Sequence, residues 1–166
     1  NRRGSNRSRM KLQWQVNPFM SQTGTRVSEA IALRWRDVDM VAKTALLVKT
    51  KTDRNTTRHM TDQLVARLYT LAAAAKPNAR VFRYKCRHSV NERIRAVCER
   101  AKISDKPSHT SGRHAFANNT LAMRIVIKSI MDAGDWRSAA VFLGTYANPR
   151  NAGRVVAERH NLYLLE

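Results

Sequence analysis

The chain has 166 residues, 43% of them apolar, and carries 31 Lys and Arg against 12 Asp and Glu, a formal net charge of +19. This length suits one core of ordinary size and is short for two, so we expect a single folded domain. The charge indicates a polyanionic partner, of which DNA and RNA are the commonest, although a ribosomal or chromatin protein would share it. No apolar run approaches the roughly 18 residues of a membrane span, and Cys86 and Cys98 form neither a disulfide framework nor a zinc pattern.

The first eleven residues are basic and nearly free of apolar side chains. They read NRRGSNRSRMK and start with Asn rather than Met. We interpret residues 1–11 as a basic linker or arm and expect the folded domain over residues 12–166, with further protein upstream. A frayed terminus without function is the alternative.

The first half of the chain predicts two helices and a hairpin. The helices cover Leu12–Met20, which Pro18 interrupts unless it lies in a first turn, and the stretch from Val27 to Trp35. The β-branched run from Thr44 to Thr50 and the segment from Thr56 to Met60 predict antiparallel strands joined at a basic tip.

The second half predicts helices alone. Asp62 and Ser89 each precede apolar positions at helical spacing and are expected to cap two of them. Further helices are expected over residues 113–123, 125–134 and 138–146, and from Asn151 to about Leu165. The pattern therefore predicts a mainly α fold with a small antiparallel β-sheet.

Three separated segments stand out: TGTRVSEAIALRWRDVD at 23–39, SGRHAFANNTL at 111–121 and GDWRSAAVFLGTY at 134–146. Together they resemble the tyrosine recombinase (phage integrase) family. The first is similar to the family's first-arginine box, the second to its H-x-x-R-H-x-F-A box, and the third to its His-or-Trp box followed by the nucleophilic tyrosine. The resemblance covers about residues 20–160 and implies the family's catalytic-domain fold.

Arg26 and Arg113 lie inside the first two boxes. A phosphodiester under attack gathers negative charge on its non-bridging oxygens, and two planar guanidiniums can clamp those oxygens. We therefore expect both to be catalytic, although an arbitrary arginine in so basic a chain would simply neutralise phosphate.

Tyr146 is the expected nucleophile. A tyrosine has a free pKa of about 10 and reacts usefully only when it is held in line among positive charges. Of the other tyrosines, Tyr69 lies beside Leu68 and is expected in the core, Tyr84 lies in a basic loop, and Tyr163 is near the end. The resemblance implies a covalent phosphotyrosyl link to DNA that requires neither ATP nor a metal.

Lys51 and Glu29 complete the expected site. The leaving 5′ oxygen needs a proton, which a lysine with a lowered pKa can supply. The family's lysine lies on a hairpin, where we favour Lys51 over Lys49; a lysine that only touches phosphate is the alternative. Glu29 follows Arg26 by three residues and is expected to orient a partner, unless it is a solvated helix carboxylate.

The sequence departs from the family pattern at two positions. The family's His would fall on Thr110, but His109 is the histidine present, so either the loop bulges by one residue or the role is vacant. Trp136 stands at the second His position, where it can donate a hydrogen bond but cannot act as a base, unless it is a core aromatic. His114 is as well suited to a structural role as to a catalytic one.

The resemblance implies site-specific DNA recombination through a covalent 3′-phosphotyrosyl intermediate. A type IB topoisomerase-like enzyme and a non-catalytic basic DNA-binding module are the alternatives. The expected partners are double-stranded DNA and further copies of the chain in a homo-oligomer on DNA, a tetramer, which exchanges its terminal helix. We expect a cytoplasmic, nucleoid-associated protein of bacterial or phage origin.

Overall fold

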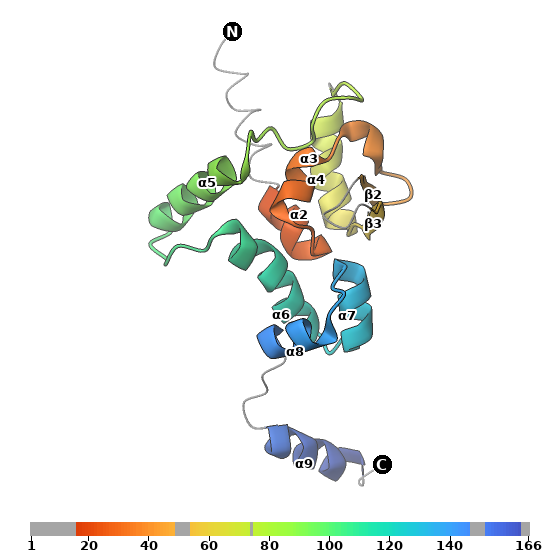
Figure 1. The fold of residues 1–166 in the computed structure, drawn as a ribbon, viewed down its shortest axis with the longest axis vertical. Coiled ribbons are helices and arrows are strands. Elements are labelled where there is room, and N and C mark those ends of the chain that lie inside the picture. Colours follow the sequence, from red (N-terminus) through yellow and green to blue (C-terminus); the bar gives the residue numbers. More distant parts are fainter. Residues whose placement is uncertain (1–15, 49–53, 74, 147–151, 164–166) are drawn as a thin grey trace. The chain divides into compact units, whose positions relative to one another are not determined.

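The computed structural model describes residues 16–48, 54–73, 75–146 and 152–163 (Figure 1). The chain divides into two compact units, Asn1–Asp135 and Trp136–Glu166. The first unit contains α2 (Val16–Thr23), α3 (Val27–Ala32), the 3-10 turn η1 (Trp35–Asp37), β1 (Val38–Asp39), β2 (Thr44–Leu47), β3 (Thr56–His59), α4 (Asp62–Ala72), α5 (Arg87–Arg100), the π-helix η2 (His109–His114), α6 (Ala115–Ala122) and α7 (Ile127–Gly134). The second contains α8 (Ala139–Tyr146) and α9 (Ala152–Tyr163). The expected mainly α fold with a small antiparallel sheet is confirmed.

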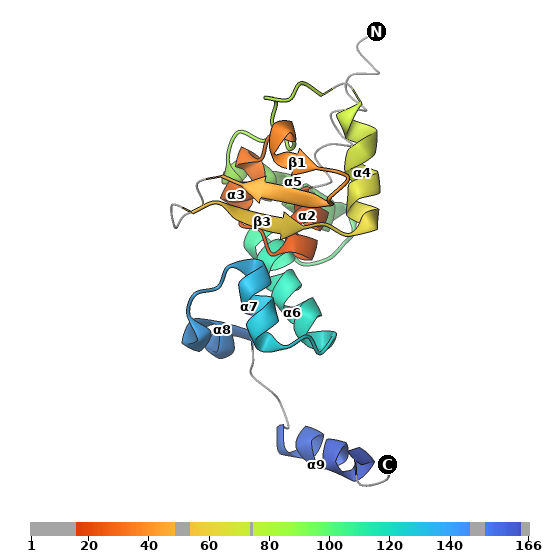
Figure 2. The same cartoon turned by 90° about the vertical axis from the view of Figure 1, so that its right-hand side faces the viewer.

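The sheet has the strand order β1-β2-β3, and both pairs are antiparallel. Thr44 pairs with His59 and Leu47 with Thr56, which confirms the predicted hairpin, and the short β1 adds a strand that the sequence did not predict. Along β2, Ala45 and Leu47 are buried whereas Leu46 is exposed, as the twofold period of a strand requires. One face of the sheet therefore covers the core (Figure 2).

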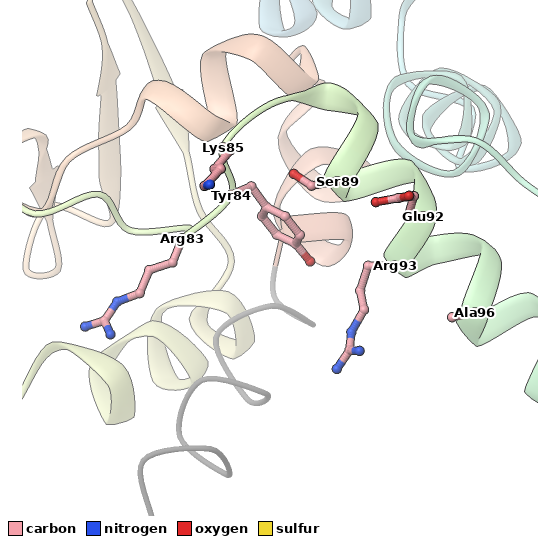
Figure 3. Close-up of a pocket in the computed structure, with 7 residues that line it drawn as sticks. All are labelled: Arg83, Tyr84, Lys85, Ser89, Glu92, Arg93 and Ala96. Atoms are coloured by element: carbon pink, nitrogen blue, oxygen red, sulfur yellow. The ribbon is translucent and has the colours of Figure 1, made fainter. Parts of the chain in front are cut away.

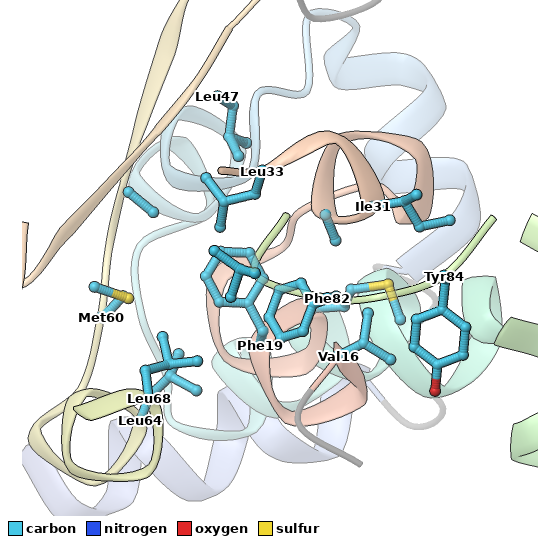
Figure 4. Packing of buried hydrophobic residues seen from close by; sticks show 14 of the residues in the cluster. Val16, Phe19, Ile31, Leu33, Leu47, Met60, Leu64, Leu68, Phe82 and Tyr84 are labelled. Atoms are coloured by element: carbon cyan, nitrogen blue, oxygen red, sulfur yellow. The ribbon is translucent and has the colours of Figure 1, made fainter. Parts of the chain in front are cut away.

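The core of the first unit joins α2, α3, β2, α4 and the loop before α5 (Figure 4). Its centre is the Phe19–Phe82 pair, whose ring centroids lie 5.3 Å apart. Leu64 and Leu68 are fully buried on one face of α4, which confirms the helical spacing predicted there. Burial of these side chains is the main contribution to the stability of the unit.

Three predicted helix boundaries need correction. Asp62 is the first residue of α4 and not its cap, since Thr61 Oγ1 accepts the Leu64 N–H at 3.2 Å. Cys86 rather than Ser89 stands at the cap position of α5, and the Ser89 hydroxyl donates back to the Cys86 carbonyl at 2.8 Å. α3 ends at Ala32 instead of reaching Trp35, because Leu33 is already extended. Side chains one turn inside a helix can satisfy its first N–H groups, so a capping residue is hard to place from sequence alone.

α2 covers Val16–Thr23 and so passes the predicted end at Met20, while residues 12–15 lie outside the described residues. Pro18 lies in the first turn of α2, where a proline is tolerated. Further along the first unit, α6 and α7 lie side by side (Figures 1 and 2). α7 ends where Asp135 adopts a left-handed conformation with φ 56° and ψ 51°. This turn is where the first unit ends.

Candidate active site

The guanidiniums of Arg26 and Arg113 converge on the backbone carbonyl of Asp135. Arg26 Nη2 donates to it at 3.2 Å and Arg113 Nη2 at 3.3 Å. Arg113 also donates from Nη1 to the Gly24 carbonyl at 2.7 Å. Two boxes that are far apart in the sequence are therefore held together at the end of α7.

Glu29 and Asp135 hold Arg26 through their carboxylates. Arg26 Nη1 donates to Glu29 Oε1 at 2.7 Å and to Asp135 Oδ2 at 3.2 Å. Glu29 Oε2 accepts the Arg26 backbone N–H at 2.9 Å. The Glu29 side chain is only 6% exposed, so the alternative of a solvated carboxylate is wrong.

The two arginines differ in exposure. Arg113 is 6% exposed, whereas the Arg26 side chain is 26% exposed. Burial alone would lower the pKa of Arg26, but the hydrogen bonds and charges of Glu29 and Asp135 outweigh it and raise that pKa. Arg26 thus stays cationic and presents part of its side chain to solvent, where a phosphate oxygen can approach it.

The turn between α2 and α3 sets the position of Arg26. Gly24 has a φ of +68°, a conformation that favours glycine, and a Cβ there would lie 2.9 Å from Phe116 Cδ1. The hydroxyls of Thr23 and Thr25, both buried, lie 2.7 Å apart and hydrogen-bond to each other. The TGTR sequence therefore codes for a tight turn that places Arg26 at the start of α3.

A third arginine lies against this cluster and was missed by the sequence analysis. Arg58 on β3 is 3% exposed, and its Nη1 donates to the Ala133 carbonyl at 2.8 Å. Burial lowers the pKa of Arg58, the charges of Glu29 and Asp135 act in the opposite direction, and Arg26 lowers it further. The register of the hairpin gives the signal that could have found Arg58. Arg58 pairs with Ala45, residues that pair across two strands share a face of the sheet, and Ala45 faces the core.

Asp135 was also missed, although it precedes Trp136 directly in the third box. Both its carboxylate and its carbonyl contribute contacts, and a carbonyl contact leaves no trace in a residue pattern.

His109 is the first residue of the π-helix η2, which ends at His114. The Ala115 N–H donates to the Thr110 carbonyl five residues earlier, one residue more than in an α-helix. The imidazoles of His109 and His114 lie edge to face with centroids 4.2 Å apart. The one-residue offset of His109 from the family pattern coincides with this wider π-helical turn.

Trp136 and Tyr146 lie together in the second unit with Phe142, which is fully buried. The Trp136 and Tyr146 ring centroids lie 5.7 Å apart at an interplanar angle of 80°, and Phe142 and Tyr146 are 5.0 Å apart. The first contact is edge to face and the second is tilted, and both favour one orientation of the Tyr146 ring. Tyr146 is thus held by two aromatic neighbours from its own unit.

Of the other tyrosines, Tyr84 lies in a loop as expected, but Tyr69 differs from expectation. Tyr69 was expected in the core but is 69% exposed on α4. Tyr84 is buried instead, and burial raises its pKa to about 12, with the charge of Arg93 opposing this. A phenol buried in this way is a poor nucleophile, which leaves Tyr146 favoured over Tyr84.

Lys51 and Lys49 lie outside the described residues. Over the described ranges, no cluster of three or more His, Cys, Asp or Glu side chains is placed to hold a metal ion, and none of the described helices is long and apolar enough to cross a membrane.

A separate pocket of about 350 Å³ lies beside the first turns of α5 (Figure 3). Its lining includes three cationic side chains, those of Arg83, Lys85 and Arg93, as well as Glu92 and the buried Tyr84. None of the expected catalytic residues that the structure describes lines it. The pocket belongs to the basic surface of the chain rather than to the arginine cluster.

A model of the phage integrase family matches residues 7–152. No curated protein sequence matches the chain.

Several solved structures share the fold. XerA recombinase aligns with a TM-score of 0.74 at 20% identity over 90% of this chain and 57% of its own. The integrase of the transposon Tn1549, in complex with a circular intermediate DNA, aligns at 0.69 and 14% identity over 88% and 58%. The catalytic domain of bacteriophage HP1 integrase aligns at 0.60 and 20% identity over 91% and 90%. The chain thus spans under two thirds of the first two proteins and nine tenths of the HP1 domain.

Proposed function

The chain belongs to the phage integrase family, and we propose that it is the catalytic domain of a site-specific DNA recombinase that cuts and rejoins DNA by transesterification. The observation that carries this proposal is a pair of guanidiniums. Arg26 and Arg113 come from two separate boxes, and both donate to the carbonyl of Asp135. Such a preorganised pair suits the developing charge of a phosphoryl transition state.

In the proposed reaction the Tyr146 hydroxyl gives its proton to solvent water, and its oxygen forms a bond to the DNA phosphorus. The bond from phosphorus to the 5′ oxygen breaks, and the leaving oxygen keeps the electron pair and takes up a proton. The products are a 3′-phosphotyrosyl link and a free 5′ hydroxyl. The hydroxyl of another strand then reverses the steps. One phosphodiester is exchanged for another, so the chemistry needs no ATP and no metal.

Each remaining residue has a proposed role. Arg26 and Arg113 bind the non-bridging oxygens, and Glu29 and Asp135 orient Arg26. Lys51 protonates the leaving oxygen, with Lys49 as the alternative. His109, brought into the turn that carries Arg113 by the π-helix, is a second proton-transfer or hydrogen-bonding group.

Trp136 has two roles open to it, as a hydrogen-bond donor to phosphate and as a ring that holds Tyr146. Its edge-to-face contact with Tyr146 favours at least the second.

The partner is double-stranded DNA, to which the net charge of +19 contributes electrostatic attraction, and residues 1–11 act as a basic arm. Affinity should fall steeply with salt, with a log-log slope of about −0.9 per phosphate contacted. A flat salt dependence would contradict DNA as the partner. An enzyme with this substrate works in the compartment that holds the DNA, which we take to be the bacterial cytoplasm.

The assembly we propose is a homotetramer on DNA with exchange of the terminal helix. In α9 every side chain that the structure describes is exposed, among them Val156 at 55% and Tyr163 at 76%. Apolar side chains left in water favour docking on another surface.

The test of the function is Tyr146→Phe with labelled duplexes that carry a nick and a randomised sequence. The substitution removes only the attacking oxygen and keeps the ring that contacts Trp136 and Phe142. Covalent adduct on a denaturing gel should be lost, whereas DNA affinity should stay within about twofold of the wild type. Tyr69→Phe, at an exposed tyrosine, is the matched control and should keep full adduct formation.

Adduct formed by Tyr146→Phe would place the nucleophile elsewhere. Absence of adduct with the wild type, together with salt-dependent DNA binding, would favour the non-catalytic DNA-binding module. Relaxation of supercoiled DNA without strand exchange would favour the topoisomerase-like enzyme.

A further inference from the structure

Arg58 is a buried cation whose hydrogen bonding is incomplete. It is 3% exposed, and Nη1 donates to the Ala133 carbonyl at 2.8 Å, while Nε and Nη2 are buried without a hydrogen-bond partner among the residues that the structure describes. A charge removed from water with donors unmet destabilises a fold unless neighbouring charges compensate. An apolar side chain would fill this position without the cost of burying a charge. We therefore expect Arg58 to have a role in the site beyond packing.

The compensating charges belong to the candidate active site. Glu29 and Asp135 attract the Arg58 guanidinium, and Arg26 repels it. These are the two carboxylates that hold Arg26. Arg58 therefore shares its counterions with a residue that is expected to bind phosphate.

Arg58 decides the charge of this cluster. Arg26, Arg58 and Arg113 supply three positive charges, and Glu29 and Asp135 supply two negative ones, which leaves one formal positive charge. Without Arg58 the four remaining groups would sum to zero. Because Arg58, Arg113 and Glu29 are buried, such a difference acts strongly on a phosphate.

Arg58 also anchors the backbone that the two site arginines use. Its hydrogen bond reaches the carbonyl of Ala133, and two residues later the carbonyl of Asp135 accepts from both Arg26 and Arg113. On the other side, β3 is paired with β2, and the segment that joins these strands contains Lys51. Arg58 thus links the return strand of the hairpin to the end of α7.

We propose that Arg58 is a positioning residue for strand cleavage, which keeps the arginine cluster cationic and fixes the end of α7 against the β2–β3 hairpin. The inference rests on the proposed function. Arg58 does not contact the DNA itself, because its free donor atoms are buried.

The test compares Arg58→Met, Arg58→Gln and Arg58→Lys in the full chain, with nicked duplexes of randomised sequence. Met and Gln remove the charge and should slow adduct formation by about tenfold or more, while DNA affinity stays within about twofold. Lys keeps the charge without the planar fork and should restore part of the rate. Arg67→Met removes an equal charge from the exposed face of α4 and should leave the rate unchanged.

A second substrate separates charge from mere structural support. A duplex with a neutral methylphosphonate at the nick-adjacent position carries no charge to be neutralised, so the defect of Arg58→Met and Arg58→Gln should shrink on it relative to the phosphate duplex. A purely structural defect would be equal on both. Gln keeps an N–H group that can donate to the Ala133 carbonyl. The Arg58→Gln variant therefore replaces Arg58→Met in this test if thermal melting shows that the Met variant does not fold.

Three outcomes are distinguishable. If the wild type forms no adduct, the proposed function fails and Arg58 is not the cause. If the wild type is active and the neutral variants cleave within about twofold of it, the proposal for Arg58 is wrong. An equal defect on charged and neutral duplexes also overturns it.

Discussion

Arg113 donates a 2.7 Å hydrogen bond from Nη1 to the backbone carbonyl of Gly24, which lies 89 residues earlier in the chain. The acceptor belongs to a residue with a φ of +68°. The direction of that carbonyl, and with it the position of Arg113, depends on a backbone conformation that residues other than glycine rarely adopt.

We expect Gly24→Ala to reduce both stability and cleavage. The new Cβ would lie 2.9 Å from Phe116 Cδ1 and 3.2 Å from Gly134 Cα, in a conformation strained for alanine. The free energy of unfolding should fall by about 1–3 kcal/mol, measured by urea denaturation. Adduct formation should fall further than DNA affinity, because the Arg113 acceptor moves.

Gly144→Ala on α8 is the matched control. A Cβ there meets no atom of the described residues within 4 Å, so the variant should be more stable than the wild type by about 0.5–1 kcal/mol. Equal effects of the two substitutions would contradict the role of the Gly24 turn.

The His109 and His114 pair should make stability fall below about pH 6.5, the usual pKa of histidine in unfolded chains. Burial lowers the pKa of both, and His114 and Arg113 lower that of His109 further. The unfolded state therefore binds more protons than the folded state as the pH falls through 6.5, and stability is lost on the acidic side.

The measurement is urea denaturation at pH 7.5 and pH 5.5. The double substitution of His109 and His114 by Gln should lose less stability between these values than the wild type. Identical losses of stability in the two proteins would show that groups other than these histidines cause the loss at low pH.

Trp136→Phe separates the two roles of the indole. Phenylalanine keeps an aromatic ring beside Tyr146 but has no N–H to donate. If the indole bonds phosphate, adduct formation should fall by about tenfold in Trp136→Phe and about as far in Trp136→Ala. A Phe variant close to the wild type, with the Ala variant alone impaired, would leave ring packing as the only role.

Deletion of residues 152–166 should abolish higher-order complexes on a full recombination site, and reduce cleavage with them. The described side chains of α9 are exposed, so the helix has surface available for a neighbouring copy. Gel shift at increasing protein concentration gives the complexes, and adduct formation gives cleavage. If higher-order complexes and cleavage both survive the deletion, α9 does not take part in assembly.

The sequence by itself determined most of the elements and the three boxes, although it did not predict β1. The helical spacing of Leu64 and Leu68 and the β-branched, apolar run that starts at Thr44 depend on local geometry, and the structure has a helix and a strand there. Arg26 and Arg113 were identified from their boxes, and the fold places them together. Local periodicity is enough for such features, because each side chain reports which face of its own element is buried.

Only the tertiary structure decided which other groups complete the cluster. The carbonyl of Asp135 and the buried guanidinium of Arg58 act across long sequence distances, and Tyr69 proved exposed because the buried face of α4 is the one that carries Leu64 and Leu68. A backbone acceptor carries no side-chain signature, and the balance of three arginines against two carboxylates exists only once separate segments pack together. Residue patterns depend on the local geometry of one helix or strand. The net charge of the arginine cluster depends instead on which charged side chains the fold brings close together.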